Sequence, residues 1–372
     1  MIEQALFYLI RVGLRVDALN GGFVFPELDE RGWEALKALS EKQAVSGIVL
    51  DGLNQTINDK GKNKIAGRTD AEWWTLFITT WIGETAVIRQ QNLLLNQRTV
   101  EVARLFDKAG IRNCILKGQG NAMYYPESQS RMPGDIDIWV DMGREETMAF
   151  VRRLCPEAKG CEHHIDMPIF ADATVEVHFK PRYLFSPKHN RAFDQYVERH
   201  RDEQFEHLVK LDGQDKICVP TAEFNLVYLL THMMGHFVED GIGLRQMTDY
   251  YMLLRTIHKE ESTVKDYGEA VRAMGMERFA RGLMWIGKEK IGLPEDSMML
   301  EGDEQYGKII LKDVMETGNL GQYGEFLQSR ERIPYAKRSL MYLKRQASIW
   351  PVVGVESPWH LWGVLKDKVG GQ

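Results

Sequence analysis

The chain has 372 residues and a formal charge of −6, from 47 Lys and Arg against 53 Asp and Glu. With 44% hydrophobic and 27% charged residues, its composition is that of a folded globular protein, which excludes a disordered chain. The mild acidity excludes a surface that is devoted as a whole to nucleic acid, and it is compatible with a local basic patch. The length suggests two or three packed units.

The N-terminal third predicts helices. Residues 1–50 carry helical patterns that are broken at Gly21-Gly22. The stretch 51–70 is polar, rich in glycine and without a regular period, so it predicts a loop. Residues 71–110 predict a long helix with one buried stripe near its end.

After residue 110 the pattern changes to short, branched segments that are typical of strands. The predicted strands cover residues 111–116, 135–140, 164–170 and 174–180, and a helix is expected over residues 145–154. Residues 181–220 are charged and fit neither pattern clearly.

From residue 221 onward the spacing of apolar residues predicts helices only. Helices, then a small strand-rich centre, then helices again predict an α+β fold. We divide the chain into an N-terminal helical region (1–100), an α/β core (101–215) and a C-terminal helical domain (216–372).

Four cysteines show neither a CxxC pair nor the spacing of a disulfide framework, so we expect reduced thiols. No run approaches the roughly 20 apolar residues that a membrane-spanning helix needs. The N-terminus lacks a small-residue cleavage site and predicts a first helix instead of a signal peptide. These features together predict a cytoplasmic protein.

Two aspartates in the segment 135–140 (DIDIWV) are the first candidate site residues. Side chains two apart in a strand project from the same face, so Asp135 and Asp137 lie together while the isoleucines face the core. Adjacent carboxylates repel each other unless a cation sits between them. An isolated pair of this kind is more often the wet face of a surface strand.

The same alternation recurs in the segment 175–179 (VEVHF), where Glu176 and His178 share the polar face. If the two strands are neighbours, Glu176 joins the aspartates, and three carboxylates suit a pair of Mg²⁺ ions or of Mn²⁺ ions. Alone, Glu176 would be a solvent-facing strand residue. His178 fits a contact to substrate or to a metal-bound water as well as it fits a structural hydrogen bond.

Upstream, residues 116–120 (LKGQG) join a predicted strand to a helix. Glycines in such a turn let backbone N–H groups approach a phosphate, and Lys117 adds a charge. A tight turn needs glycines in any case. Arg131 is a second candidate phosphate ligand, and an ordinary solvated arginine is equally compatible with the sequence.

Taken together, LKGQG, the segment from Arg131 to Ile138 and VEVH resemble the DNA polymerase β-like nucleotidyltransferase superfamily. Within it the chain is most similar to a bacterial group of uncharacterised nucleotidyltransferases, which shares the LKG turn and the Tyr125-Pro126 pair. The resemblance covers roughly residues 100 to 255. The segment 243–251 adds a likeness to the Arg-to-Asp helix of toxin-type nucleotidyltransferases.

This resemblance implies a small mixed β-sheet core, flanked by helices at both ends, with the active cleft between the core and the C-terminal helices. It implies that Asp135, Asp137 and Glu176 are catalytic and hold two Mg²⁺ ions. The implied reaction is Mg²⁺-dependent transfer of a nucleoside monophosphate from a nucleoside triphosphate to a hydroxyl on a small molecule, protein or RNA.

The superfamily's phosphate turn usually reads Gly-Ser, and here Lys117-Gly118-Gln119 stands in its place. Nucleotide binding then depends on Lys117, Gly118, Gln119 and Arg131. Two alternatives stay open: a degenerate protein that binds nucleotide or a partner without turnover, and a toxin-like enzyme that modifies tRNA.

Three further groups of polar residues have to be weighed. Arg245 and Asp249 lie four apart on a predicted helix, where they form either an intrahelical salt bridge or part of the cleft in contact with substrate. His232 and His236 fit a core or interface role better than a metal site. The last group does not match a closed zinc pattern and consists of Cys155, Cys161, His163 and His164.

Overall fold

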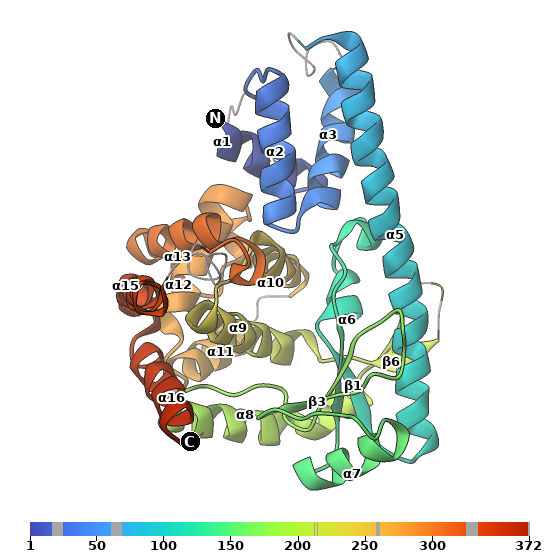
Figure 1. Cartoon of the computed structure of the whole chain (residues 1–372), viewed down its shortest axis with the longest axis vertical. Helices are drawn as coiled ribbons and strands as arrows, with labels where there is room; N and C mark the ends of the chain where they lie inside the picture. The colour runs from blue at the N-terminus through green and yellow to red at the C-terminus, as the bar shows by residue number, and fades with distance from the viewer. Residues whose placement is uncertain are drawn as a thin grey trace.

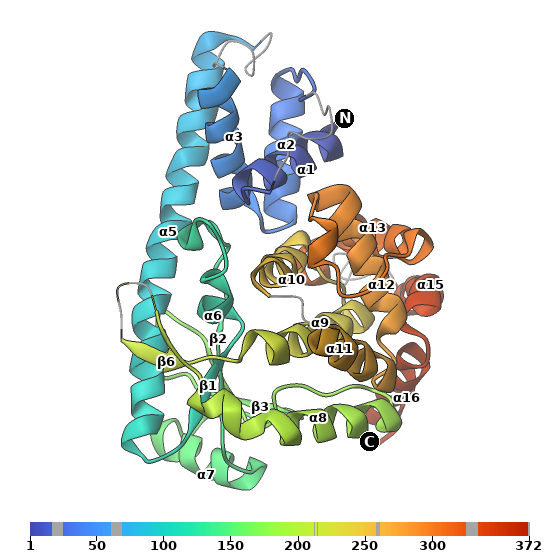
Figure 2. The ribbon, with the colours of Figure 1, turned by 180° about the vertical axis from the view of Figure 1, so that it is seen from behind.

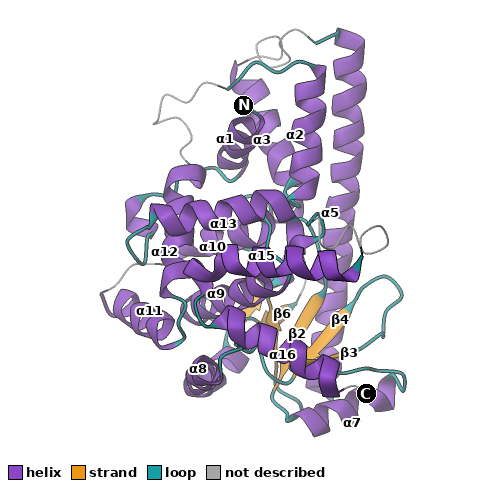
Figure 3. Ribbon diagram, turned by 60° about the vertical axis from the view of Figure 1, so that its left-hand side comes forward, coloured by secondary structure: helices purple, strands orange, loops and turns teal. Residues whose placement is uncertain are grey.

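The computed structural model describes residues 1–16, 25–60, 69–211, 213, 215–257, 261–324 and 334–370. Figure 3 shows that helices form most of the molecule and that the strands form one small group within them. The predicted α+β class is confirmed. The expected break at Gly21-Gly22 lies outside the described residues.

The main helices are α1 (Ile2–Gly13), α2 (Glu30–Lys42), α3 (Ser46–Lys60), α5 (Ala71–Lys108), α6 (Gly118–Ala122), α7 (Arg144–Leu154), α8 (Pro187–Glu206), α9 (Ala222–Glu239), α10 (Leu244–Thr256), α11 (Glu261–Ala273), α12 (Glu277–Ile286), α13 (Glu304–Thr317), α15 (Tyr335–Val353) and α16 (Glu356–Gly370). The strands are β1 (Asn113–Leu116), β2 (Ile136–Val140), β3 (His164–Asp166), β4 (Val175–His178), β5 (Leu208–Lys210) and β6 (Lys216–Cys218).

Helix α3 corrects the prediction of a loop over residues 51–70, because the described residues 51–60 are helical. Its glycine serves helix packing instead of a turn: a Cβ on Gly52 would overlap the carbonyl oxygen of Leu9, and one on Gly13 would overlap that of Ile48. Two glycines therefore let α1 and α3 approach backbone to backbone, which composition alone does not distinguish from a flexible loop.

The long helix α5 runs along one side of the molecule, from the N-terminal helices at one end to α7 at the other (Figures 1 and 2). It packs against β1, β2 and β6. The central sheet has the strand order β1-β2-β4-β3, in which β2 and β4 are parallel and the outer strands are antiparallel to their neighbours. The predicted strands thus form one small mixed sheet.

The two faces of this sheet have different partners. Ile115, Ile138 and Val177 belong to an apolar core that also contains Val102 and Phe106 of α5. On the opposite face, Leu116 and Trp139 join the larger core of the C-terminal helices. The polar side chains of β2 and β4 alternate with the α5-facing residues. They therefore point toward the C-terminal helices.

Residues 181–220, which the sequence left open, form α8 and a β5–β6 hairpin. Figure 2 shows α8 alongside the sheet, below α9 and α11. Helices α9 and α10 are almost wholly buried beneath α11 to α16. Within the described part of the chain, every helix is too short or too polar to cross a membrane.

Candidate active site

Three carboxylates meet at the edge of the sheet where β2 begins. The parallel pairing of β2 with β4 sets Asp137 opposite Glu176, and Asp135 directly precedes β2. Ligand oxygens of Asp135, Asp137 and Glu176 all lie within 4.8 Å of one another. The structure therefore brings together the three acidic residues that the alternation of the two segments suggested.

Asp137 is the buried centre of this group, with 1% of its surface exposed. Lys117 donates a hydrogen bond from Nζ to Asp137 Oδ1 at 2.9 Å, and His178 donates from Nε2 to the same oxygen at 2.8 Å. Burial alone would raise the pKa of Asp137, but Lys117 and His178 hold it well below its usual range. His178 Nε2 also lies 3.4 Å from Glu176 Oε2, so it links two of the acids.

Asp135 behaves in the opposite way. Repulsion from Asp137, followed by burial, raises the pKa of Asp135 above its ordinary value. A divalent cation held among the three carboxylates would relieve this repulsion, and oxygen-only donors are those that Mg²⁺ and Mn²⁺ prefer. The donor set thus fits such an ion.

The turn between β1 and α6 aims Lys117 at the acids. Lys117 has a φ of +51° and Gly118 a φ of +41°, both in the left-handed region. Such a conformation is costly for lysine and is found where the surrounding structure enforces it, often at functional sites. Gln119 points elsewhere: its amide donates to the Asn92 carbonyl at 3.2 Å and to the Asn96 side chain on α5. The structure thus does not bring Gln119 to the carboxylates.

Arg131 is engaged by a partner from another element. Its Nε and Nη2 donate to the two carboxylate oxygens of Asp249 on α10, each at 2.7 Å, and the guanidinium is 1% exposed. Tyr125 donates to the same Asp249 at 2.7 Å. Asp249 therefore pairs across the cleft with Arg131, and the intrahelical pair with Arg245 that the sequence allowed is not its principal contact.

Arg245 instead lies against the loop that leads into β2. Its Nη1 donates to the Pro133 carbonyl at 3.3 Å, and a Cβ on Gly134 would come within 2.8 Å of its Nη2. Its Nε has no hydrogen-bond partner among the described residues. A partly buried guanidinium with an unused donor beside three carboxylates is suited to bind an anion that accompanies a metal ion.

A pocket collects these groups between the sheet and helices α9 and α10. It is lined by the three carboxylates and by basic or imidazole side chains. These other side chains include Lys117, Arg182, His232, His236 and Arg245. Carboxylates together with the cations Lys117, Arg182 and Arg245 match a metal–triphosphate complex, in which both charges are present.

A family model described as "uncharacterised nucleotidyltransferase" matches residues 29–291 of the chain. The chain belongs to this family. The resemblance seen in the sequence motifs is therefore confirmed, and this nucleotidyltransferase-family match extends further toward the N-terminus than those motifs do.

A crystal structure of an antigenic nucleotidyltransferase-like protein from Paracoccidioides brasiliensis shares 11% identity with this chain. It covers 57% of this chain and 95% of its own length, with a TM-score of 0.35. No match was found among curated proteins.

Three lining residues of this nucleotidyltransferase-family protein were not selected from its sequence. His232 and His236 line the pocket, although their spacing suggested a core or interface role, and burial keeps their pKa values well below the usual range. Arg182 donates from Nη2 to Glu239 at 2.9 Å. In the folded chain Gly235 makes room for this arginine, because a Cβ there would come within 2.6 Å of Arg182 Nη2.

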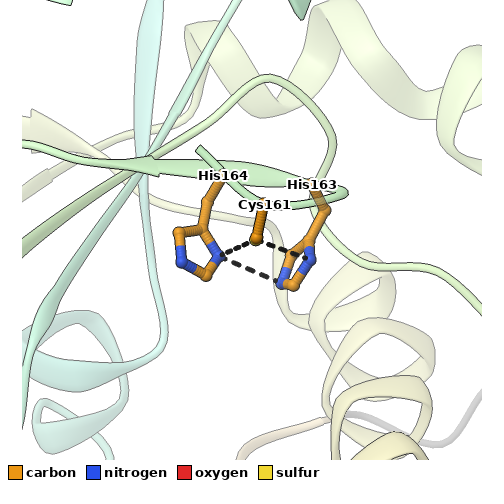
Figure 4. A group of neighbouring side chains, drawn as sticks. All are labelled: Cys161, His163 and His164. Carbon is orange, nitrogen blue, oxygen red and sulfur yellow. Dashed lines mark hydrogen bonds between the residues drawn. The ribbon is translucent and has the colours of Figure 1, made fainter. Parts of the chain in front are cut away.

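A cysteine–histidine group (Figure 4) lies beside the same pocket, which His163 and His164 line. Ligand atoms of Cys161, His163 and His164 lie within 4.8 Å of one another, whereas Cys155 is buried in the core on the α5 side of the sheet. Burial opposes ionisation of the Cys161 thiol, but hydrogen bonds from His164 and from backbone N–H groups lower its pKa to about 7. Three of the four residues that the sequence argument set aside are therefore neighbours.

Proposed function

We propose that the protein is a Mg²⁺-dependent nucleotidyltransferase that moves a nucleoside monophosphate from a nucleoside triphosphate to an acceptor hydroxyl. The observation that carries the proposal is the meeting of Asp135, Asp137 and Glu176 within 4.8 Å, in a pocket that Lys117, Arg182 and Arg245 also line. Membership of a nucleotidyltransferase family supports it.

In this proposal Asp135, Asp137 and Glu176 hold the divalent cations, two Mg²⁺ ions or Mn²⁺ in their place. Bound there, the metal would supply charge neutralisation at the α-phosphate and would activate the acceptor hydroxyl. The acceptor oxygen forms a bond to the α-phosphorus, the bond from that phosphorus to the bridging oxygen breaks, and pyrophosphate leaves. The proton of the hydroxyl passes to a carboxylate of the group.

The cationic side chains that line the pocket bind and orient the triphosphate. Lys117 is close enough to the acids to contact the phosphates that accompany the metal, and Arg245 offers its unused Nε–H. Arg131 acts indirectly, because its bidentate pair with Asp249 fixes α10 and thereby Arg245 against the strand β2. His178 holds its proton at Nε2 and keeps Asp137 and Glu176 aligned.

One contact favours the degenerate alternative, in which nucleotide binds without turnover. Lys117 already neutralises Asp137 at 2.9 Å, so a cation at that oxygen has to displace the ammonium group. The turn also lacks the serine of the usual Gly-Ser pair. An intact acidic group with a weakened phosphate turn would give a nucleotide-binding protein without pyrophosphate release.

The test is incubation of the full chain with labelled nucleoside triphosphates, Mg²⁺ and acceptors from three classes (small molecules, proteins and tRNA), with pyrophosphate as the readout. We expect Asp137→Asn to lower Mg²⁺-dependent release on the order of a hundredfold. The matched control is Asp141→Asn, since Asp141 lies just beyond the other end of β2 and pairs with Arg112.

Unchanged Mg²⁺-dependent release in Asp137→Asn would contradict the proposal. Nucleotide binding without release for every acceptor would select the degenerate alternative. A modified tRNA 3′ end, together with growth arrest on expression, would identify tRNA as the acceptor.

A further inference from the structure

The turn before β3 and the first residue of β3 carry three side chains of the kinds that bind metals, and the proposed transfer reaction does not use them. The Cys161 N–H donates to the His164 carbonyl at 2.9 Å, and Gly160 bridges Ile165 in antiparallel fashion. Residues 160–165 therefore form a closed hairpin with residues 162 and 163 at its tip. This backbone holds Cys161, His163 and His164 on one short turn, as Figure 4 shows.

The separations of the donor atoms match those of a tetrahedral metal site. Cys161 Sγ lies 3.3 Å from His164 Nδ1 and 3.7 Å from His163 Nδ1. Bond lengths of about 2.3 Å to sulfur and about 2.05 Å to nitrogen place such atoms about 3.6 Å apart around a tetrahedral zinc ion. The two imidazoles are also close, with 3.3 Å between His164 Nδ1 and His163 Nε2, so the rings have only to turn to bring three donor atoms around one ion.

The outer contact of His164 also fits a metal ligand. Its Nε2 lies 3.4 Å from Asp166 Oδ1, so an Nε2–H can face this carboxylate once Nδ1 exchanges the proton that it donates toward Cys161 for a metal ion. Histidines that bind metals usually donate their second ring N–H to a carboxylate in this way, which fixes the tautomer. Glu176 Oε2 lies 3.5 Å from the same Nδ1 and borders a fourth ligand position.

His163 is the ligand that has to change. Arg182 donates from Nη1 to His163 Nε2 at 3.3 Å, which leaves the ring proton on Nδ1 beside the sulfur. Binding a metal at Nδ1 moves this proton to Nε2, so Arg182 gives up this contact and keeps its bond to Glu239. Because the thiol proton is released as well, the site takes up metal more strongly as pH rises.

From the convergence of their donor atoms within 4.8 Å we infer that Cys161, His163 and His164 form a binding site for a divalent transition metal of the zinc class. Thiolate and imidazole donors select such ions, whereas the oxygen-only group of Asp135, Asp137 and Glu176 selects Mg²⁺ or Mn²⁺. The pocket would then hold two cation sites of different chemistry, which share the wall that carries Glu176. The zinc-class site stands independently of the proposed transfer reaction.

Co²⁺ is the probe, because thiolate coordination gives it a charge-transfer band in the near ultraviolet that oxygen ligands do not give. We expect the reduced full chain to develop this band with one equivalent of Co²⁺ and to lose it when Zn²⁺ is added. Cys161→Ser and His164→Asn should each remove the band. Asp166→Asn should weaken Co²⁺ binding by about tenfold to a hundredfold, as removal of a carboxylate behind a histidine ligand does.

Two controls separate this site from the rest of the molecule. Cys218→Ser should keep the band, since Cys218 donates from Sγ to the Phe205 carbonyl at 3.0 Å and a serine hydroxyl can replace it. Asp137→Asn should keep the band while it loses Mg²⁺-dependent nucleotide binding, so failure of either site is visible separately. A wild-type chain without the band, or a Cys161→Ser variant with an unchanged band, would overturn the inference.

Discussion

Two buried arginine–aspartate pairs in this molecule have nearly the same geometry and different surroundings. Arg131 and Asp249 join the loop before β2 to α10 with two bonds of 2.7 Å. Arg345 and Asp313 join α15 to α13 with bonds of 2.8 and 2.9 Å. All four side chains are almost completely buried. Only the first pair lies at the candidate active site.

The neighbours of each aspartate account for the difference. Around Asp249, burial is outweighed by Arg131 and Arg245 together with the bond from Tyr125, so its pKa is lowered. Around Asp313, burial outweighs the single partner Arg345, so its pKa is raised. The same ion pair therefore acts as part of a charged pocket wall in one place and as a structural joint in the other.

Loss of either aspartate should be the most damaging change to stability. We expect Asp249→Ala and Asp313→Ala each to lower the free energy of unfolding by about 3–5 kcal/mol, because each removes the carboxylate that balances the charge of a buried guanidinium. Urea denaturation followed by tryptophan fluorescence measures this. A loss below about 1 kcal/mol in both variants would show that the pairs are relaxed by water.

Titration with nucleoside triphosphate, at urea concentrations below the denaturation midpoint of each variant, then distinguishes the two pairs. The Asp249→Ala variant should bind nucleoside triphosphate more weakly, since α10 loses its bond to Arg131 and Arg245 is no longer held in place. The Asp313→Ala variant should keep the affinity of the native chain. Equal affinities would reduce the first pair to a structural joint like the second.

Gly134→Ala tests the contribution of Arg245 without touching either aspartate. The added Cβ would come within 2.8 Å of Arg245 Nη2 and has to displace this guanidinium. We expect triphosphate affinity to fall about tenfold, in the range of a lost bond to a charged group. Isothermal titration measures it, with Gly83→Ala as the control, since a Cβ at Gly83 meets nothing within 4 Å.

Acid titration should affect the two pairs with opposite sign. The folded-state pKa of Asp249 lies below its unfolded value of about 3.9. Its stabilising contribution is therefore present above the unfolded value and is lost as the pH falls from there through the folded-state pKa. The folded-state pKa of Asp313 lies above the unfolded value, so protonation between the two favours the folded state.

The matched variants check this sign in chemical denaturation between roughly pH 6 and pH 3. Asp249→Asn should make stability less sensitive to acid in the lower part of this window. Asp313→Asn should make it more sensitive in the upper part. If the free energy of unfolding changed with pH in the same way in both variants, the neighbours of the two aspartates would not set their charge.

The sequence alone predicted only part of the candidate active site. Alternation in two short segments placed Asp137 and Glu176 on the polar faces of their strands, because the period of a strand is a local property. That the strands are neighbours depends on topology, and the resemblance to a family supplied it. Mixed sheet, flanking helices and family were all predictable in this way.

Long-range partners were not predictable. Arg131 and Asp249 lie 118 positions apart, and only the folded chain shows that this arginine binds α10. Cys161, His163 and His164 are neighbours in the sequence and fit no zinc spacing pattern, so only the folded hairpin shows that their donor atoms lie within 4.8 Å of one another. The sequence predicts a loop around Gly52, because composition does not distinguish a loop glycine from one that lets another helix approach.

A third arginine–aspartate pair has the same two-bond geometry without the burial, and so separates the effects of the two. Arg98 binds Asp172 with the same two-bond arrangement, at 3.0 and 2.8 Å, but both side chains are partly exposed. In water the charges are already solvated and screened, so removing one of them leaves nothing uncompensated. We therefore expect Asp172→Ala to leave the denaturation midpoint within experimental error and nucleotide affinity unchanged. A loss that approaches that of Asp313→Ala would show that two-bond geometry, and not the low-dielectric surroundings, makes the buried pairs strong.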